Sequence, residues 1–438
     1  MLVLLVACTG PTPEDSPPAD RVVVPWSAER APLEEVSAND RPWRRGIIHL
    51  HSIWSHDACD NHQMDDAPCL ADLRAGLCAT AMDYAFLTDH PAQAAEKTYE
   101  ELLHVGEGDS VVDGIANRMA CPSGHPVMVL PGIEDELMPI GLDRHAADTP
   151  AENDRLYNGT DAEAIAADIA AGATVLHAHT EGYPLETLLA AQADGLSGVE
   201  LFNLHAMVDP TKREDDLGLG AFDYLDAIGP FLTGDTDAEP DLAFLGFYEE
   251  QTVSIEKWDA LNAVAFTVGT AGTDAHENAI PSLMDDGERV DSYRRMMSWF
   301  SNVVLVDGDS PAEYQTAVAA GRLFVAFEIL GTPAGFDVSY GDLEMGGEAS
   351  VGGTLSVSCP TLAGTSPRDG DDPEISVTVF RDGEIWQEEC GDWSIAEPGV
   401  YRVRVDIVPH HLAGFLDDQQ ALVRAYPWLY SNAIRVVP

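Results

Sequence analysis

Between about residues 44 and 330, short apolar runs typical of buried strands alternate with Ala- and Leu-rich helical patterns. Seven runs have the length and composition of buried strands: 46–51, 84–90, 127–135, 174–179, 198–203, 266–276 and 302–306. Helical segments such as 161–172, 184–195 and 310–321 separate them and end in glycine, which is favoured just after a helix C-terminus. Repeated β-α alternation predicts a parallel sheet, and seven such strands favour a closed barrel over an open, doubly wound sheet.

Two further patterns complete the fold prediction. No G-x-G-x-x-G motif follows the first strand-like run, which disfavours a dinucleotide-binding fold. From about residue 336, short alternating runs are separated by Gly, Pro and Asp, as in ISVTVFRDG and VYRVRVDIV. This pattern is typical of a small antiparallel β-sandwich. We therefore expect an α/β fold with a barrel over residues 44–335 and a β-sandwich over residues 336–438.

Histidines and carboxylates stand at the C-terminal ends of the predicted strands, where barrel active sites are built. Residues two apart on a strand point to the same side. Such pairs are His49 with His51, Glu134 with Glu136, His177 with His179, and Asp274 with His276, while His90 ends the second strand. Imidazole and carboxylate groups are ligands for Zn, Mn or Fe. One pair alone would be weak evidence, but their recurrence at successive strand ends predicts a metal site.

The motifs HLHSIWSHD, LTDHP, GIE, AHT and GTDAH, in this order, resemble the PHP (polymerase and histidinol phosphatase) superfamily. The resemblance covers roughly residues 44–330 and implies a distorted seven-stranded β/α barrel with two or three divalent ions, Zn, Mn or Fe. Matched residue by residue, it implies metal ligands at His49, His51, His56, His90, Glu134, His179, Asp274 and His276. Among these ligands, those expected to hold a metal-bound hydroxide are His49, His51, Glu134 and Asp274.

The sequence departs from the family pattern at Thr180, which replaces the proline of an Ala-His-Pro motif, and at two ligand positions. His56 stands where many members have Asp, so Asp57 is its nearest rival. The family histidine that usually follows the bridging glutamate has no clear counterpart, and Glu136, His145 and His177 are the alternatives.

The segment GVELFN resembles a family segment that follows the fifth strand. Its Glu200 and Asn203 are expected to orient ligands or to cap the strand end. His205, close by, is a candidate proton donor.

The expected reaction is metal-assisted hydrolysis, in which a hydroxide held between two ions bridged by Glu134 attacks the substrate. Three hypotheses remain open. The first is a phosphoesterase acting on a small phosphate ester, for which Arg118, Arg144 and Arg213 are possible phosphate-binding side chains. The second is a carboxylic or carbamic ester hydrolase, which an apolar pocket without converging Arg would favour. The third is a non-catalytic surface lipoprotein whose metals stabilise the barrel.

The formal net charge is −52, and the only lysines are Lys97, Lys212 and Lys257. Such a surface repels nucleic acid and anionic membranes, so we expect neither as a partner. We interpret the acidity as adaptation to salt. The expected partner is a small-molecule phosphate or ester substrate.

The N-terminal stretch Leu5-Val6-Ala7-Cys8 resembles a bacterial lipobox. It predicts a signal segment over residues 1–8, a lipid anchor on Cys8 as the only membrane contact, and a flexible acidic and Pro-rich tether over residues 9–43. The protein would then be exported to the periplasm or cell surface. The alternative is a misassigned start with an incidental cysteine. The lipoprotein start and the trailing β-sandwich together resemble an exported branch of carbaryl-hydrolase-like metallohydrolases.

Export permits disulfides, and six cysteines remain after Cys8. Cys359 and Cys390 are the cysteines of the C-terminal region and are expected to pair. Three pairings are open for the other four, Cys59, Cys69, Cys78 and Cys121. A zinc-ligand role competes for Cys59, although no CxxC spacing supports it.

Overall fold

The computed structural model describes residues 23–26, 30–61, 67–364 and 372–438. The lipobox-like segment with Cys8 lies outside these residues, as does the first part of the expected tether. Among the described residues, no helix is both long and apolar enough to cross a membrane.

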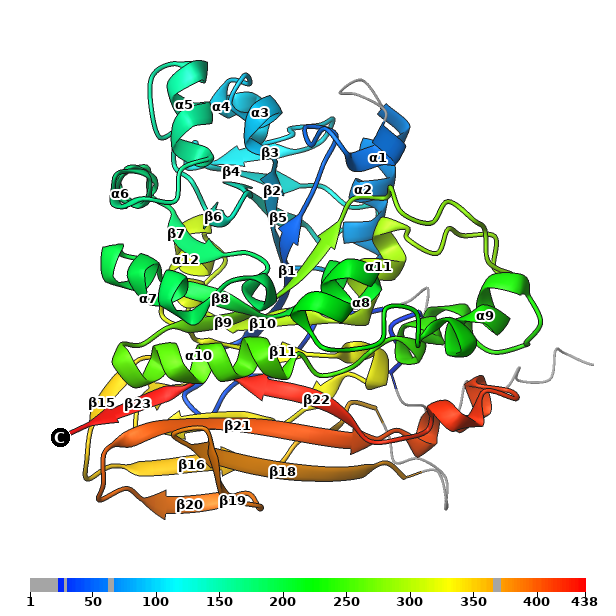
Figure 1. Cartoon of the computed structure of the whole chain (residues 1–438), viewed down its shortest axis with the longest axis vertical. Coiled ribbons are helices and arrows are strands. Elements are labelled where there is room, and N and C mark those ends of the chain that lie inside the picture. The colour runs from blue at the N-terminus through cyan, green and yellow to red at the C-terminus, as the bar shows by residue number, and fades with distance from the viewer. Residues whose placement is uncertain (1–22, 27–29, 62–66, 365–371) are drawn as a thin grey trace, which may run out of the picture.

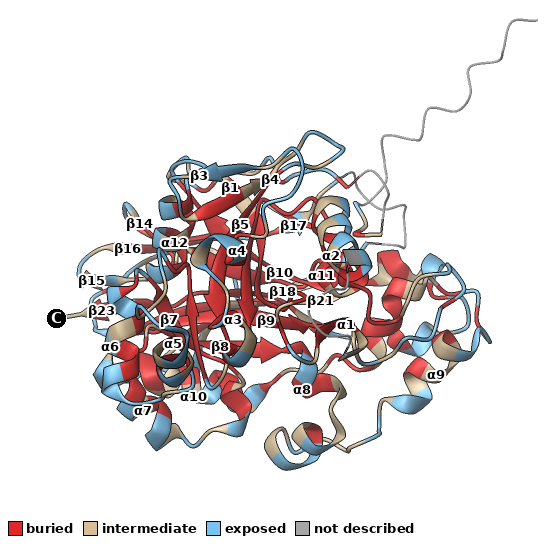
Figure 2. Ribbon diagram, turned by 90° about the horizontal axis from the view of Figure 1, so that it is seen from above, coloured by how far each residue is buried: buried red, intermediate tan, exposed pale blue. Residues whose placement is uncertain are grey.

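Seven strands close a barrel (Figure 1). In ring order they are β1 (Trp43–Leu50), β2 (Tyr84–Asp89), β5 (Val127–Ile133), β6 (Leu137–Ile140), β7 (Thr174–His177), β8 (Gly198–Asn203) and β9 (Val268–Ala275). Neighbours are parallel except where β6 meets β5 and β7, and the ring closes through the parallel pair β9 and β1. Every residue of β2 and β5 to β9 is buried, as expected for a sheet covered on both faces (Figure 2). The predicted seven-stranded barrel is confirmed.

One strand of the ring differs from the prediction. Residues 302–306 lie largely in β10 (Ser301–Leu305), which pairs antiparallel with the first half of β1 and with β11 (Leu323–Ala326), outside the ring. The remaining barrel position is filled by β6, whose sequence is LMPI. A four-residue strand directly after β5 is too short to show its own periodicity, so it merges with the preceding apolar run.

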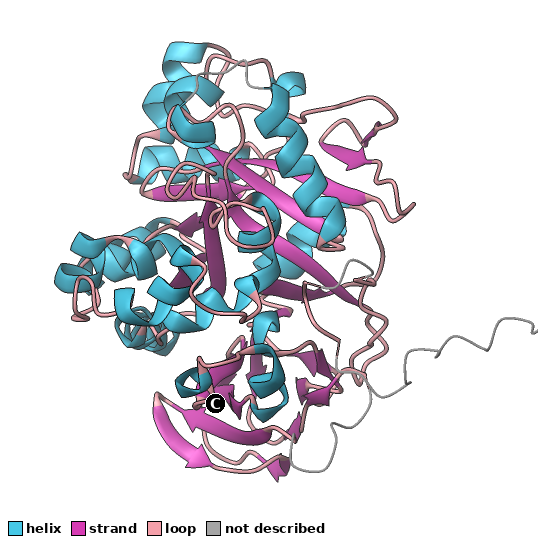
Figure 3. Cartoon of the chain, turned by 90° about the vertical axis from the view of Figure 1, so that its right-hand side faces the viewer, coloured by secondary structure: helices cyan, strands magenta, loops and turns pink. Residues whose placement is uncertain are grey.

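Helices cover the barrel (Figures 1 and 3). The helices before β8 are α1 (Ala58–Asn61), α2 (Ala67–Ala79), α3 (Pro91–Ala94), α4 (Tyr99–Leu102), α5 (Pro150–Tyr157), α6 (Ala162–Ala170) and α7 (Leu185–Asp194). Those after it are α8 (Leu204–Val208), α9 (Leu225–Thr233), α10 (Thr252–Val264), α11 (Tyr293–Trp299) and α12 (Pro311–Ala319). Predicted helices 161–172, 184–195 and 310–321 correspond to α6, α7 and α12. Asp161 and Ser310 cap α6 and α12 by accepting from backbone N–H groups of the first turn.

The C-terminal part consists of two antiparallel sheets and forms the predicted sandwich (Figure 3). One sheet contains β18 (Glu374–Arg381), β19 (Glu384–Gln387), β21 (Gly399–Val408), β22 (Tyr426–Ser431) and β23 (Ile434–Val437), with β15 (Glu348–Ser350) added in parallel. The other contains β13 (Asp337–Tyr340), β14 (Leu343–Glu344), β16 (Thr354–Ser358) and β20 (Gly391–Ser394). β12 (Pro333–Ala334) and β17 (Thr361–Leu362) form a separate two-stranded sheet. β3 (Ser110–Val112) pairs with β4 (Ala116–Met119), which in turn pairs antiparallel with the barrel strand β5.

The barrel and the sandwich share one sheet and one core. β11 pairs with β10 on one side and β22 on the other, so hydrogen bonding runs from β1 into the sandwich. The rings of Trp43 and Phe324 lie 4.9 Å apart, and those of Phe324 and Phe336 lie 5.2 Å apart. The expected boundary at residues 335 and 336 is therefore bridged by packed residues.

Residues 30–43, expected as the last part of a flexible tether, pack against the fold instead. The buried guanidinium of Arg30 lies 2.8 Å from Glu328 Oε2, which also accepts from Arg45 Nε. Ser37 Oγ donates to Glu344 Oε1 at 2.6 Å. Charged and polar groups in this segment find buried partners that its Pro- and Glu-rich composition does not reveal.

Three disulfides cross-link the described residues: Cys59–Cys69, Cys78–Cys121 and Cys359–Cys390. The expected Cys359–Cys390 pair is confirmed, and the structure selects one of the three open pairings for the other four. Because Cys59 is disulfide-bonded, its competing role as a zinc ligand does not apply.

Asp168 on α6 provides a test of pH-dependent stability. It is 1% exposed, its Oδ1 has no hydrogen bond, and burial raises its pKa to about 7 from an ordinary value near 4. The folded state keeps this proton up to about pH 7, whereas the unfolded chain loses it near pH 4, so stability falls as pH rises from about 4 and levels off above about 7. We expect Asp168→Asn to be more stable than the wild type in urea unfolding, by on the order of 1 kcal/mol at pH 5 and 3–4 kcal/mol at pH 8. The exposed Asp148→Asn should show no such trend; an advantage independent of pH would contradict the assignment.

Candidate metal centre

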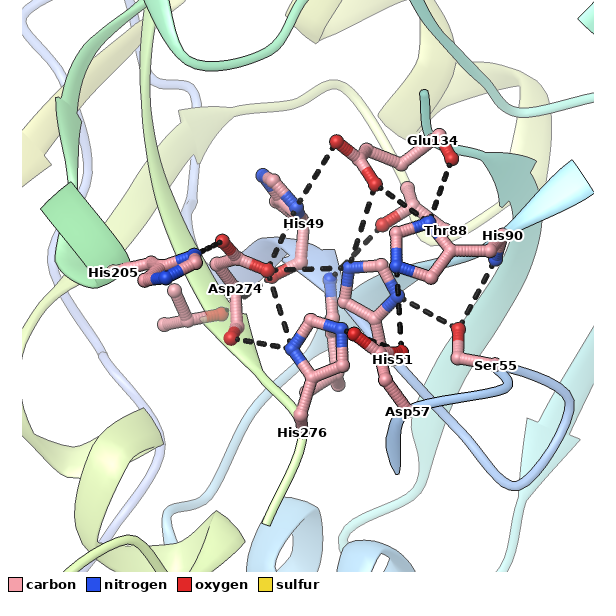
Figure 4. Close-up of polar contacts among 12 residues, drawn as sticks. His49, His51, Ser55, Asp57, Thr88, His90, Glu134, His205, Asp274 and His276 are labelled. Atoms are coloured by element: carbon pink, nitrogen blue, oxygen red, sulfur yellow. Dashed lines mark hydrogen bonds and ion pairs between the residues drawn. The ribbon is translucent and has the colours of Figure 1, made fainter. Parts of the chain in front are cut away.

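Seven of the eight predicted ligands converge at the C-terminal end of the barrel strands, and Figure 4 labels all of them except His179. His49 lies in β1 and Asp274 in β9, while the others follow β1, β2, β5, β7 and β9 at once or within two residues: His51, His90, Glu134, His179 and His276. Asp274 Oδ1 lies 3.2 Å from His49 Nε2 and 3.3 Å from His51 Nε2, and Asp274 Oδ2 lies 3.4 Å from His179 Nε2. Glu134 Oε2 lies 3.0 Å from His90 Nδ1. We call these seven residues the central cluster.

The backbone is strained at three positions of the cluster. His49, His179 and Asp274 have φ values of 66°, 50° and 49°, in the left-handed region that non-glycine residues rarely adopt. The register of β1 shifts between Ile48 and Leu50 against β9, so a bulge re-aims His49. Each such residue costs on the order of 1–3 kcal/mol and persists only where the surroundings enforce it. Strain concentrated in one side-chain cluster is typical of a functional site.

The imidazoles of the cluster are held by their outer nitrogens. His49 Nδ1 lies 2.7 Å from Glu200 Oε1, His51 Nδ1 2.8 Å from Ser55 Oγ, and His276 Nδ1 2.9 Å from the Asp274 carbonyl oxygen. The Nε2 atoms of these three histidines are buried and have no hydrogen-bond partner. Buried polar atoms are rarely left unpaired. In each of these imidazoles Nδ1 has a protein partner, whereas the inward-facing Nε2 has none. Such Nε2 atoms fit the donor set of a divalent metal ion.

Burial and charge shift the pKa values of the cluster in opposite directions. Burial and the neighbouring His276 hold the pKa of His51 well below its ordinary value, which favours the neutral, ligating form. Although burial alone would raise the pKa of Asp274, His49 and the other histidines around it hold that pKa well below its usual range. Although burial alone would lower the pKa values of His49, His179 and His276, the neighbouring carboxylates raise them. Metal ligands must be deprotonated, so metal binding would release protons from these imidazoles.

Asp57, the rival of His56, lies inside the site. Its Oδ1 is 3.4 Å from both His90 Nε2 and His276 Nε2 and is buried without a hydrogen bond. His56 is exposed, and its ring lies 5.1 Å from that of His90; it forms one metal-compatible group, with Asp57 and His90. Burial alone would lower the pKa of His90, but Asp57 and Glu134 raise it to about 11. The geometry favours Asp57 as the carboxylate facing His90 and His276, with His56 at the rim.

The three alternatives for the missing family histidine lie outside the metal-compatible groups formed by the described residues. Glu136 is exposed and lines a separate cavity together with His177. His177 Nδ1 lies 2.7 Å from the Ala178 carbonyl oxygen. His145 lies between the Tyr157 hydroxyl, at 3.0 Å, and the Lys97 carbonyl oxygen, at 2.9 Å.

Supporting side chains complete the site. Glu200 Oε2 accepts from the His179 N–H at 2.8 Å and from Asn203 Nδ2 at 2.9 Å. Asn203 also caps the helix α8, because its side chain accepts from the Ala206 N–H. Sequence reasoning missed Ser55, whose hydroxyl links His51 to Asp89 Oδ1 at 3.1 Å. The sequence signal for this contact was Asp89, which directly precedes His90 in the motif LTDHP.

A cavity of about 230 Å³ opens over the central cluster. Its other side carries apolar side chains, among them Leu204, Val208 and Met296. No Lys or Arg is among the described residues that line it. The candidate phosphate-binding arginines donate elsewhere to carbonyl oxygens: Arg118 to Asp309, Arg144 to Ala170, and Arg213 to Met207 and Gly220.

Comparison with known proteins finds no matching family model and no matching curated sequence. One similar solved structure is a two-domain protein from Bacteroides vulgatus containing a predicted PHP-like metal-dependent phosphoesterase, with 10% identity, a TM-score of 0.38, and coverage of 92% of this chain and 99% of that chain. PsfC from Pseudomonas syringae has 12% identity, covers 63% and 89%, and scores 0.35. A provisionally assigned metal-dependent phosphoesterase from Bifidobacterium adolescentis has 12% identity, covers 61% and 96%, and scores 0.27. At these identities and scores, none of them assigns an activity to this chain.

Proposed function

We propose that this chain is a metal-dependent hydrolase of the PHP type, with phosphoester hydrolysis as its first candidate reaction. The observation that carries the proposal is the set of inward-facing, orphaned Nε2 atoms of His49, His51 and His276 beside the carboxylates of Glu134 and Asp274. Buried nitrogens without partners next to carboxylates are costly unless a cation joins them.

Two or three divalent ions, of Zn, Mn or Fe, would be held by subsets of the central cluster together with Asp57, His56 and His205. The metal-compatible groups are His49, His51 and Asp274; His49, Glu134 and His179; His51, His90 and His276; His56, Asp57 and His90; and His179, His205 and Asp274. Shared residues link these groups into one multinuclear site. Bound ions would polarise a substrate oxygen and activate water for attack.

Side chains next to the central cluster would then orient its imidazoles and transfer a proton. Glu200 and Ser55 fix the tautomers of His49 and His51 so that each Nε2 faces inward. His205 lies at the cavity mouth with its side chain 44% exposed and its Nδ1 3.1 Å from Asp274 Oδ2. We assign to its outward-facing Nε2, which lies 3.8 Å from Asp209, proton transfer to the leaving group.

A second candidate is hydrolysis of a carboxylic or carbamic ester at the same centre. One observation favours it: among the described residues that line the cavity, there is no Lys or Arg to bind a phosphate. Export as a lipoprotein anchored through Cys8 stays a prediction, which the three disulfides support because such bonds persist in oxidising compartments.

The deciding experiment is metal analysis of purified, metal-replete protein, followed by assays on phosphomonoester, phosphodiester, carboxylic ester and carbamate substrates. We expect two or three transition-metal ions per chain and turnover that a chelator removes and added metal restores. Fewer than one ion per chain would refute the proposal. Two or more tightly bound ions without turnover of any substrate would instead favour a metal-stabilised, non-catalytic protein.

A further inference from the structure

We propose that the cavity selects an ester that carries an apolar group of roughly aryl size and no more than one negative charge. This inference rests on the proposed hydrolase function. Leu204, Val208 and Met296, which we call the apolar wall, would contact the apolar group of the substrate while the reacting group faces the central cluster.

The apolar wall is a built part of the site. Leu204 and Val208 are the first and last residues of α8, the helix that directly follows β8, and Asn203 caps this helix. Met296 lies on α11, whose first turn is capped by Ser292. Leu204 is 1% exposed, whereas Val208 and Met296 are partly exposed and pack against the main hydrophobic core. The wall is thus anchored from behind and presents apolar surface to the cavity that also contains the cluster.

The size of the cavity limits what it can accept. Its volume of about 230 Å³ lies below the usual range of about 300–1,000 Å³ for small-molecule sites. A long or branched polar substrate would extend into solvent, where the wall gives it no contact. One ring or a short alkyl chain suits the space beside the reacting group.

The charges around the cavity disfavour a dianionic reacting group. Outside the central cluster and Asp57, the acidic residues lining it are Glu277 and Asp291. The nearby Arg289 is committed to carboxylates: its Nη1 and Nη2 donate to Asp60 at 2.6 and 2.9 Å, and its Nε donates to Asp291 at 2.9 Å. A phosphomonoester dianion would therefore find no Lys or Arg, among the described residues that line the cavity, to bind its peripheral oxygens. A diester with one charge, or a neutral ester, avoids this cost.

The test uses metal-loaded protein and substrates with a constant leaving group. We expect kcat/KM to be about 10–100-fold higher for phenyl 4-nitrophenyl phosphate than for methyl 4-nitrophenyl phosphate, since each buried CH2 equivalent is worth about fourfold. The monoester 4-nitrophenyl phosphate should be the poorest of the three. Met296→Gln and Val208→Thr, which keep side-chain size, should each lower the phenyl-to-methyl ratio at least about threefold, mainly through KM. Val264→Thr, at an exposed position on α10, should leave the ratio unchanged.

The outcomes separate this inference from the proposed function. Two results would overturn the inference without contradicting the proposed hydrolase function. One is turnover of the methyl diester with no preference for the phenyl diester, and the other is faster turnover of the monoester than of both diesters. Absence of all turnover would overturn the hydrolase. In that case calorimetry on the metal-loaded protein still tests whether the apolar wall recognises an apolar group. Benzoate should bind at least about tenfold tighter than acetate, and Met296→Gln should reduce the difference. Equal binding of the two carboxylates would refute the apolar wall as a recognition surface.

Discussion

Replacing Asp274 by asparagine is expected to lower kcat/KM by at least about 10³-fold and to remove bound metal. Asp274 Oδ1 lies within 3.3 Å of the inward nitrogens of both His49 and His51, and its Oδ2 lies 3.4 Å from His179 Nε2. Asp274 thus belongs to two of the five metal-compatible groups, and its neutralisation would weaken both at once. Residues that only support ligands already cost about 10–100-fold when mutated, so a shared ligand should cost more.

The measurements for Asp274→Asn are metal content, steady-state kinetics and thermal unfolding with and without chelator. A ligand that binds only the folded state raises its stability, so chelator should lower the Tm of the wild type but not that of the variant. The exposed Asp226→Asn on α9 is the matched control and should behave as the wild type. Full metal occupancy with turnover within about twofold of the wild type would show that Asp274 is not a ligand.

The barrel could be predicted because buried parallel strands read as continuous apolar runs separated by helices. The same reasoning failed at β6, where four residues carry no periodicity of their own. It also counted β10 as a barrel strand, because an apolar run does not reveal its partner. Local pattern thus identifies buried strands but not the edge of the sheet that each of them occupies.

The central cluster was predictable where ligands lie on strands or directly after them, since the barrel brings strand ends together. His49 and Asp274 are examples at opposite ends of the barrel sequence, joined through the β9–β1 pair. Supporting groups were less accessible to this reasoning. Glu181, for example, is buried, and its Oε1 lies 3.4 Å from His179 Nδ1, yet it follows β7 in a turn whose conformation the sequence pattern does not define.

The choice between His56 and Asp57 shows the same limit and can be tested directly. Both lie in the loop between β1 and α1, where no strand period sets the direction of a side chain. Asp57 Oδ1 is 3.4 Å from both His90 Nε2 and His276 Nε2. His56 is exposed, its ring lies 5.1 Å from that of His90, and it belongs to one metal-compatible group, with Asp57 and His90. A half-buried carboxylate whose Oδ1 lies between two imidazoles can neutralise a bound cation, while an exposed imidazole at the rim competes with water for it.

We therefore expect Asp57→Ala to weaken binding of the most loosely held metal ion by about 100-fold and His56→Ala by less than about threefold, measured by competition with a chelator of known affinity. Asp57→Asn should fall between wild type and Asp57→Ala, because the amide keeps an oxygen donor but loses the charge. Both alanine variants remove a side chain from the same loop, so each controls for loop disturbance in the other. If His56→Ala loses the metal and Asp57→Ala keeps it, the imidazole must turn inward when the ion binds, and His56 takes the ligand position at which many PHP proteins have Asp.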